Sequence, residues 1–236
     1  MKIALCLSGV VGSNQKFGKG YDLDYSIGYE HLKNSVIDQA NVDVFIHSWS
    51  QEHEEGLCKL YNPVNSIFEK QVDFGYSNPK SFAIMSQGYT RKTAVRLALN
   101  HEIENNFEYD FILLTRFDLA WFKQFNFNQL DTSKVYAAGP EAYGKINDFF
   151  FLANSKNMET LTNTYDHLPE LENLNKNEIN GTIAPSFHRA VWKHLQKSNL
   201  LPLTEYIMHR PWGSPRWEGD VRLLRLSPEV KYLKNE

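Results

Sequence analysis

Short apolar runs recur along the first half of the chain, separated by longer polar or amphipathic segments. Residues 3–9, 42–49 and 110–115 are rich in aliphatic and aromatic side chains, so they predict buried strands. Residues 65–71 predict a further, weaker strand. The first run ends in Ser-Gly, as expected where a strand of a buried parallel sheet enters a loop.

The segments between these runs place apolar residues at helical spacing. In residues 78–106, Val95, Leu99 and Ile103 recur at every fourth position and predict one face of a long helix. A shorter helix is predicted near residues 27–38, where the positions close to one face are Ile27, His31 or Leu32, Val36 and Ile37.

The long helix has two candidate starting points. Asn78 followed by Pro79 is typical of an N-cap with proline at the first helical position. Gly88 weakens a continuous helix, and Ser86 is a second capping residue from which the helix can begin.

Alternating strands and helices predict an α/β domain of three layers with a mostly parallel sheet. The pattern changes after Phe122. The elements predicted there are strands at 135–139 and 148–154, helices at 155–167 and 185–198, a polar loop at 175–180 and an ordered loop at 208–220. No internal repeat or low-complexity linker interrupts the sequence, so residues 1–236 are expected to form a single domain.

Composition excludes some classes of partner. The 236 residues include 25 basic and 28 acidic side chains, for a net charge of −3, and no basic stripe for nucleic acid is visible. No segment reaches the roughly 20 apolar residues that span a bilayer, and the apolar start is short for a signal peptide. Cys6 and Cys58 do not form a disulfide framework, and Cys6 is expected as a buried thiol. We therefore expect a soluble, cytoplasmic protein with no transmembrane segment.

Candidate ligand contacts follow from the ends of the predicted strands, because ligands of open α/β sheets bind beyond the carboxyl ends of the strands. At these ends lie Ser8 and Gly9, then His47, Ser48 and Trp49, then Arg116 and Asp118, with Asp148 just before a later strand.

Arg116 and Asp118 interrupt an otherwise apolar run. Two positions apart in an extended segment, their side chains point to the same side. One interpretation is an ion pair that closes the end of the strand, since charge clusters can be purely structural. The other is a ligand site, in which Arg116 binds phosphate oxygens and Asp118 contacts Mg²⁺ or Mn²⁺.

Other signals are weaker. The loop after Gly9 contains Lys16 and Lys19 and is a candidate phosphate cradle, but it has neither a G-x-G-x-x-G nor a P-loop pattern. No G-x-S-x-G elbow is present.

Asp148 is a candidate general base toward an acceptor hydroxyl, or equally a cap on the preceding turn. Near the carboxyl terminus, a group of aromatic and charged residues has two alternative interpretations: a contact surface for a sugar ring or a diphosphate, or an anchor that packs the tail against the core. These residues are Trp212, Arg216, Trp217 and Asp220.

Four segments resemble one known family in the same order along the chain: KIALCLSG, VDVFIHSW, YDFILLTRFDL and INDFFFLANSKNM. They are similar to landmarks of small GT-A-type glycosyltransferase-like proteins, found near bacterial capsule or lipopolysaccharide genes and in large viruses. The resemblance covers roughly residues 1–200. Its most specific motif is Arg116-Phe117-Asp118, in the place of the D-x-D motif of GT-A enzymes.

The resemblance implies a GT-A-like fold with a Rossmann-like nucleotide-sugar-binding half, residues 1–120, and an acceptor-side half, residues 121–236. It also implies Asp118 at a divalent metal, Mn²⁺ or Mg²⁺, Arg116 near phosphate or sugar, and Asp148 as the base. The chain departs from the family in two ways. Its first loop lacks the arginine that often follows the Ser-Gly pair, and Arg116 replaces the first acid of D-x-D.

Two classes of function follow. The first is a glycosyltransferase that moves a sugar from a nucleoside diphosphate sugar to a glycan hydroxyl, with Arg116 and metal stabilising the leaving diphosphate. The second is a noncatalytic nucleotide- or glycan-binding module with a degraded metal site, which the two departures favour. A phosphotransferase is a third reading, and the missing P-loop counts against it.

Overall fold

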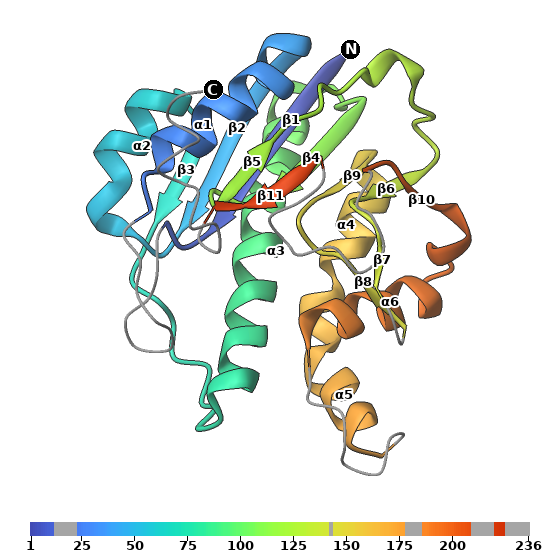
Figure 1. Cartoon of the computed structure of the whole chain (residues 1–236). Coiled ribbons are helices and arrows are strands. Elements are labelled where there is room, and N and C mark those ends of the chain that lie inside the picture. The colour runs from blue at the N-terminus through green and yellow to red at the C-terminus, as the bar shows by residue number, and fades with distance from the viewer. Residues whose placement is uncertain (12–22, 142–143, 178–185, 209–219, 225–236) are drawn as a thin grey trace.

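A seven-stranded sheet forms the middle of the part of the chain that the computed structural model describes, namely residues 1–11, 23–141, 144–177, 186–208 and 220–224 (Figure 1). In chain order its strands are β1 (Lys2–Gly9), β2 (Asn41–Ser48), β3 (Asn65–Phe68), β4 (Phe111–Thr115), β6 (Val135–Ala137), β9 (Phe151–Ala153) and β10 (Thr204–Tyr206). Their order across the sheet is β10-β6-β9-β4-β1-β2-β3.

The sheet is mostly parallel, as the sequence predicts. β1 pairs in parallel with β2 and with β4, β2 pairs in parallel with β3, and β10 pairs in parallel with β6. Only β9 runs the other way, antiparallel to both β4 and β6. The chain passes from β1 outward to β2 and β3 and then returns to place β4 on the other side of β1. The boundary between β1 and β4 is therefore a topological switch point, where open α/β sheets bind their ligands.

Residues of β1 alternate between the two faces of the sheet, because successive side chains of a strand point in opposite directions. Ile3, Leu5 and Leu7 enter one core cluster. Ala4 and Cys6 enter the other, beneath the longest helix. Both thiols are free, and burial raises the pKa of Cys6, so the prediction of a buried thiol is confirmed.

Helices cover both faces of the sheet and make the three layers visible in Figure 1. One face carries α1 (Tyr25–Ser35), α2 (Glu54–Tyr61) and an antiparallel pair formed by β5 (Leu119–Trp121) and β11 (Val221–Leu223). The other face carries α3 (Pro79–Asn105), α4 (Ser155–Thr162) and α6 (Phe187–Lys197), with α5 (Thr164–Asn177) packed on α3 and α6. A short pair, β7 (Pro140–Glu141) and β8 (Lys145–Ile146), lies beside α6. No helix in the described part of the chain is long and apolar enough to cross a membrane.

The long helix α3 begins at the first of its two candidate starts. The Asn78 side chain accepts a hydrogen bond from the Lys80 N–H at 2.9 Å, and the helix continues unbroken through Gly88. The alternative start at Ser86 is therefore wrong. Gly88 is used for packing, because a Cβ there would lie 2.7 Å from Cδ1 of Leu168 on α5.

One predicted core position of this helix is wrong. Val95 is buried and Leu99 is half-buried, but Ile103 is 78% exposed. An α-helix has 3.6 residues per turn, so eight positions rotate a side chain about 80° away from where it started. Ile103 has left the face that Val95 shares with Ala94 and Ala98.

Further differences lie in the second half. The helix predicted at 155–167 is divided into α4 and α5 at Asn163, and α5 extends over residues 175–177, where a loop was expected. Residues 178–180 of that loop, and residues 209–219 of the predicted tail loop, lie outside the described residues. The helix predicted at 185–198 is confirmed as α6, capped by Ser186. The sequence pattern did not predict α2, β5, β7, β8, β10 or β11.

Gly28 of α1 offers a test of how the helix layer fixes the loop after β4. A Cβ at Gly28 would lie 2.5 Å from the Phe117 carbonyl oxygen, which is backbone and cannot swing aside. We expect Gly28→Ala to lower the free energy of unfolding by ~1–3 kcal/mol, despite the better helix propensity of alanine. Urea denaturation measures this change.

Gly139→Ala is the matched control, because a Cβ there would meet no atom within 4 Å. Its expected change in the free energy of unfolding is under ~0.5 kcal/mol. Equal denaturation midpoints for both variants and the wild type would contradict the close approach of α1 to Phe117.

Candidate functional site

A cavity of about 310 Å³ lies at the carboxyl ends of β1, β2 and β4, at the switch point of the sheet. One wall comes from the strand ends and the other from the first half of α3. Its lining residues are Ser8, Gly9, Val10, Trp49, Gln71, Phe82, Ala83, Ser86, Gln87, Thr90, Arg91, Arg116 and Asp118.

Hydrogen bonds between strand ends fix the floor of the cavity. Ser8 donates from Oγ to the Thr115 carbonyl oxygen at 3.3 Å, which joins β1 to β4. Ser48 donates from Oγ to the Gly9 carbonyl oxygen at 2.9 Å, which joins β2 to β1. Gly9 itself has a φ of +108°, a conformation that favours glycine. The phosphate cradle predicted at Lys16 and Lys19 lies outside the described residues.

Two of the predicted contact residues lie behind the wall and do not line the cavity. Ser48 is fully buried, and its hydroxyl is used by Gly9. His47 is also fully buried, with Nε2 3.0 Å from Glu69 Oε1 and its ring edge-on to Trp49 at 4.8 Å. Burial lowers the pKa of His47, and the nearby Glu69 opposes this only in part. His47 therefore supports Trp49, and Trp49, the residue directly after β2, reaches the cavity.

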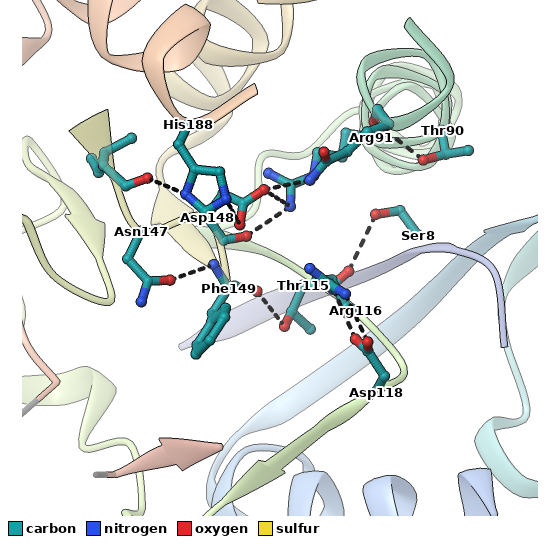
Figure 2. A network of polar contacts seen from close by, with 12 residues as sticks. Ser8, Thr90, Arg91, Thr115, Arg116, Asp118, Asn147, Asp148, Phe149 and His188 are labelled. Carbon is teal, nitrogen blue, oxygen red and sulfur yellow. Dashed lines mark hydrogen bonds and ion pairs between the residues drawn. The ribbon is translucent and has the colours of Figure 1, made fainter. Parts of the chain in front are cut away.

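Arg116 and Asp118 form the ion pair that the first of the two interpretations predicts. Arg116 donates from Nε to Asp118 Oδ1 and from Nη2 to Oδ2, both at 2.7 Å (Figure 2). This is the bidentate geometry in which a guanidinium binds a carboxylate most strongly. Burial lowers the pKa of Arg116, but Asp118 and Asp148 together outweigh burial and raise it. Both residues also line the cavity, so the pair does not exclude a ligand site.

A second, deeper ion pair joins α3 to the segment that enters β9. Arg91 donates from Nη2 to the Asp148 carbonyl oxygen at 2.7 Å and to its carboxylate Oδ2 at 3.1 Å. The side chains of Arg91 and Asp148 are only 5% and 1% exposed. Gln87 also donates from Nε2 to Asp148. Figure 2 shows Arg91 entering from α3 on one side of the site and Arg116 from the end of β4 on the other.

His188 of α6 closes the same network from the other half of the chain. Its Nε2 lies 3.4 Å from Asp148 Oδ1, and its Nδ1 lies 3.0 Å from the Ile146 carbonyl oxygen. Both ring nitrogens thus face oxygen acceptors (Figure 2). Burial by itself raises the pKa of Asp148, but the positive charge of Arg91 and its other neighbours outweigh burial and lower it to about 2.

These contacts bear on the predicted role of Asp148. A general base takes up a proton most effectively when its pKa lies near the working pH and the proton is within reach. Asp148 has a pKa of about 2, is buried and does not line the cavity. Its role as a base stays a prediction, and its contacts favour positioning of Arg91.

The donor set of the cavity fits a divalent metal poorly. Mg²⁺ and Mn²⁺ are usually bound through one or two carboxylates with phosphates and waters. Asp118 is the one carboxylate among the described lining residues, and Arg116 donates to both of its oxygens. Within the described ranges, no group of three or more histidine, cysteine, aspartate or glutamate side chains is placed to bind a metal.

The residues of α3 that line the cavity were not predicted. They include Ser86, Gln87, Thr90 and Arg91. One signal was present in the sequence: Arg91 lies four positions before Val95, so it occupies the apolar face of the helix. A charged residue on such a face needs a buried partner, and the sequence alone does not identify Asp148 as that partner.

No protein-family model matches this chain, and no curated protein matches it significantly. The chemistry of the site therefore has to be inferred from its own residues.

The pair between Arg91 and Asp148 predicts a pH dependence of stability. The pKa of Asp148 is about 2 in the folded protein and about 4 when unfolded, so its contribution is complete above about pH 4 and is lost as the pH falls toward 2. Near neutral pH we expect Asp148→Asn to lower the free energy of unfolding by about 3 kcal/mol, because Arg91 stays buried without a counter-charge. Between pH 4 and pH 2 this difference should shrink by ~2 kcal/mol.

Urea denaturation at several pH values measures both effects. Asp166→Asn is the control, since Asp166 pairs with Lys92 at the surface and exposed pairs contribute little. If wild type and Asp148→Asn lose stability equally on acidification, Asp148 is not the group responsible.

Proposed function

We propose that this chain is a glycosyltransferase that transfers a sugar from a nucleoside diphosphate sugar to a glycan hydroxyl. The observation that carries the proposal is the cavity at the switch point, whose lining brings together two guanidinium groups and two aromatic side chains; these are Arg91, Arg116, Trp49 and Phe82. The resemblance of four segments to GT-A-type proteins points in the same direction.

The chemistry of the lining suits the parts of such a donor. Guanidinium groups match phosphate oxygens through paired N–H donors. Aromatic faces such as Trp49, which is stacked on Tyr89 with centroids 5.3 Å apart, suit a base or a sugar ring. Ser8 and Gly9, at the end of β1, line the same cavity. Cleavage of the sugar–phosphate bond leaves negative charge on the diphosphate, and preorganised cations stabilise such charge most.

A noncatalytic nucleotide- or glycan-binding module is the second candidate. The observation that favours it is the engagement of both Asp118 oxygens by Arg116, which leaves the position of the D-x-D motif without a free carboxylate. Assistance by Mn²⁺ or Mg²⁺ stays a prediction.

Ligand binding and turnover together test the proposal. Calorimetric titration with the diphosphates of uridine, guanosine, adenosine and cytidine should show saturable binding of at least one of them. Incubation with the corresponding nucleotide sugars should release nucleoside diphosphate by slow hydrolysis, and faster in the presence of a glycan acceptor.

The two candidates give different results in this experiment. Binding without hydrolysis or transfer across the donor panel would assign the chain to the binding-module class. No binding of any nucleoside diphosphate, with or without Mn²⁺, would contradict both.

A further inference from the structure

Two arginines from different parts of the fold converge on the cavity. Arg91 comes from α3 and Arg116 from the end of β4, and both are lining residues (Figure 2). Asp118 is the one negative charge among the described lining residues, so two guanidinium groups face one carboxylate. Asp148, the other nearby carboxylate, is 1% exposed and bonds to Arg91 from behind the wall. Each arginine has its own counter-carboxylate, so the four charges balance, but of the two carboxylates only Asp118 borders the cavity among the described residues.

Arg91 also has hydrogen-bonding capacity that the described residues leave unused. Its Nη2 is taken by Asp148, whereas Nη1 is buried and has no hydrogen-bond partner among the described residues. An unpaired buried donor is costly and therefore uncommon in native structures. Burial lowers the pKa of Arg91 to about 10, and the positive charge of Arg116 contributes in the same direction. The guanidinium stays charged at neutral pH, close enough to Arg116 for the two to repel.

The geometry also fixes the orientation of both arginines in advance. Arg91 is bonded to the backbone and carboxylate of Asp148 and lies over the Phe187 ring, 4.8 Å from its centroid. Arg116 is held by both oxygens of Asp118. Cations oriented before the ligand arrives bind it without losing further side-chain entropy.

We propose that Arg91 and Arg116 form a diphosphate-binding subsite and that this subsite binds its ligand without a divalent metal. The two guanidinium groups take the place that a metal occupies when carboxylates form the site. The subsite rests on the proposed function only for the identity of the ligand as a nucleotide, since the two arginines are expected to bind a bare diphosphate as well.

Inorganic pyrophosphate is the probe, because it has the two linked phosphates and no base or sugar. It is titrated into the protein by calorimetry in EDTA and again with Mn²⁺, and uridine and guanosine diphosphates are titrated under the same conditions. We expect pyrophosphate to bind in EDTA, with a dissociation constant within about threefold of the value measured with Mn²⁺.

A double variant tests the role of Arg91 while keeping the core neutral. Arg91→Gln alone leaves Asp148 buried without its main counter-charge and is expected to unfold easily. Arg91→Gln combined with Asp148→Asn removes both charges together. Because a hydrogen bond to a charged group is lost, this double variant should bind pyrophosphate in EDTA about tenfold more weakly or worse.

Arg96→Gln is the matched control, since Arg96 lies on the exposed face of the same helix. It should bind pyrophosphate like the wild type. Circular dichroism of each variant before titration confirms that the compared proteins are folded. Arg91→Lys, which keeps the charge but not the fork of donors, supplies a second folded comparison and should also bind more weakly.

The results separate this inference from the proposed function. Pyrophosphate binding only in the presence of Mn²⁺, or equal binding by the wild type and the folded Arg91 variants, would overturn the arginine subsite while leaving a nucleotide-sugar transferase possible. Pyrophosphate binding in EDTA without binding of any nucleoside diphosphate would support the subsite and contradict the proposed function.

Discussion

The buried ion pair between Arg91 and Asp148 is the interaction on which the arrangement of the site depends. It joins residues 57 positions apart, one in α3 and one just before β9. Both are almost completely buried, so neither charge is tolerable without the other. Gln87 and His188 contact the same carboxylate, and His188 comes from α6. Two helices, α3 and α6, are therefore positioned around one aspartate of the segment that enters β9.

The same region joins strands from the two halves of the chain in one sheet. β9 belongs to the second half of the sequence, yet it pairs with β4 of the first half on one side and with β6 on the other. Because β9 is antiparallel to β4, the residues that precede it lie at the edge where β1 and β4 end. Thr115 marks this junction, donating from its Oγ1 to the Phe149 carbonyl oxygen at 3.1 Å. In a purely parallel sheet, the residues at this edge are those that follow the strands. Here Asp148, which precedes the antiparallel strand β9, reaches the same edge.

The main strands and helices of the first half, α2 apart, and the meeting of their strand ends at the cavity follow from the sequence, whereas the pairing of side chains does not. Apolar runs identified β1, β2 and β4, and their ends located Ser8, Gly9, Trp49 and Arg116 at the cavity. His47 also lies at the end of a strand and was therefore predicted to contact the ligand. Its ring instead pairs with Glu69, which lies just after β3, and packs against Trp49. The sequence did not predict a role for Arg91, because a helical pattern shows which face of the helix a residue occupies but not which residue packs against it. Strands of two or three residues, such as β7 and β11, are too short for any periodicity to reveal them.

The distance in sequence between Arg91 and Asp148 has a consequence for how the protein is made. Chains emerge from the ribosome from the amino terminus, and domains generally fold as units. When α3 has emerged, the carboxylate that neutralises Arg91 has still to be synthesised, together with the strand β9 that follows it. Until then, docking of α3 against β1 and β4 would bury an unpaired guanidinium, so that helix face stays in contact with water. We expect α3 to complete its packing against the sheet only after residues near 150 have left the exit tunnel.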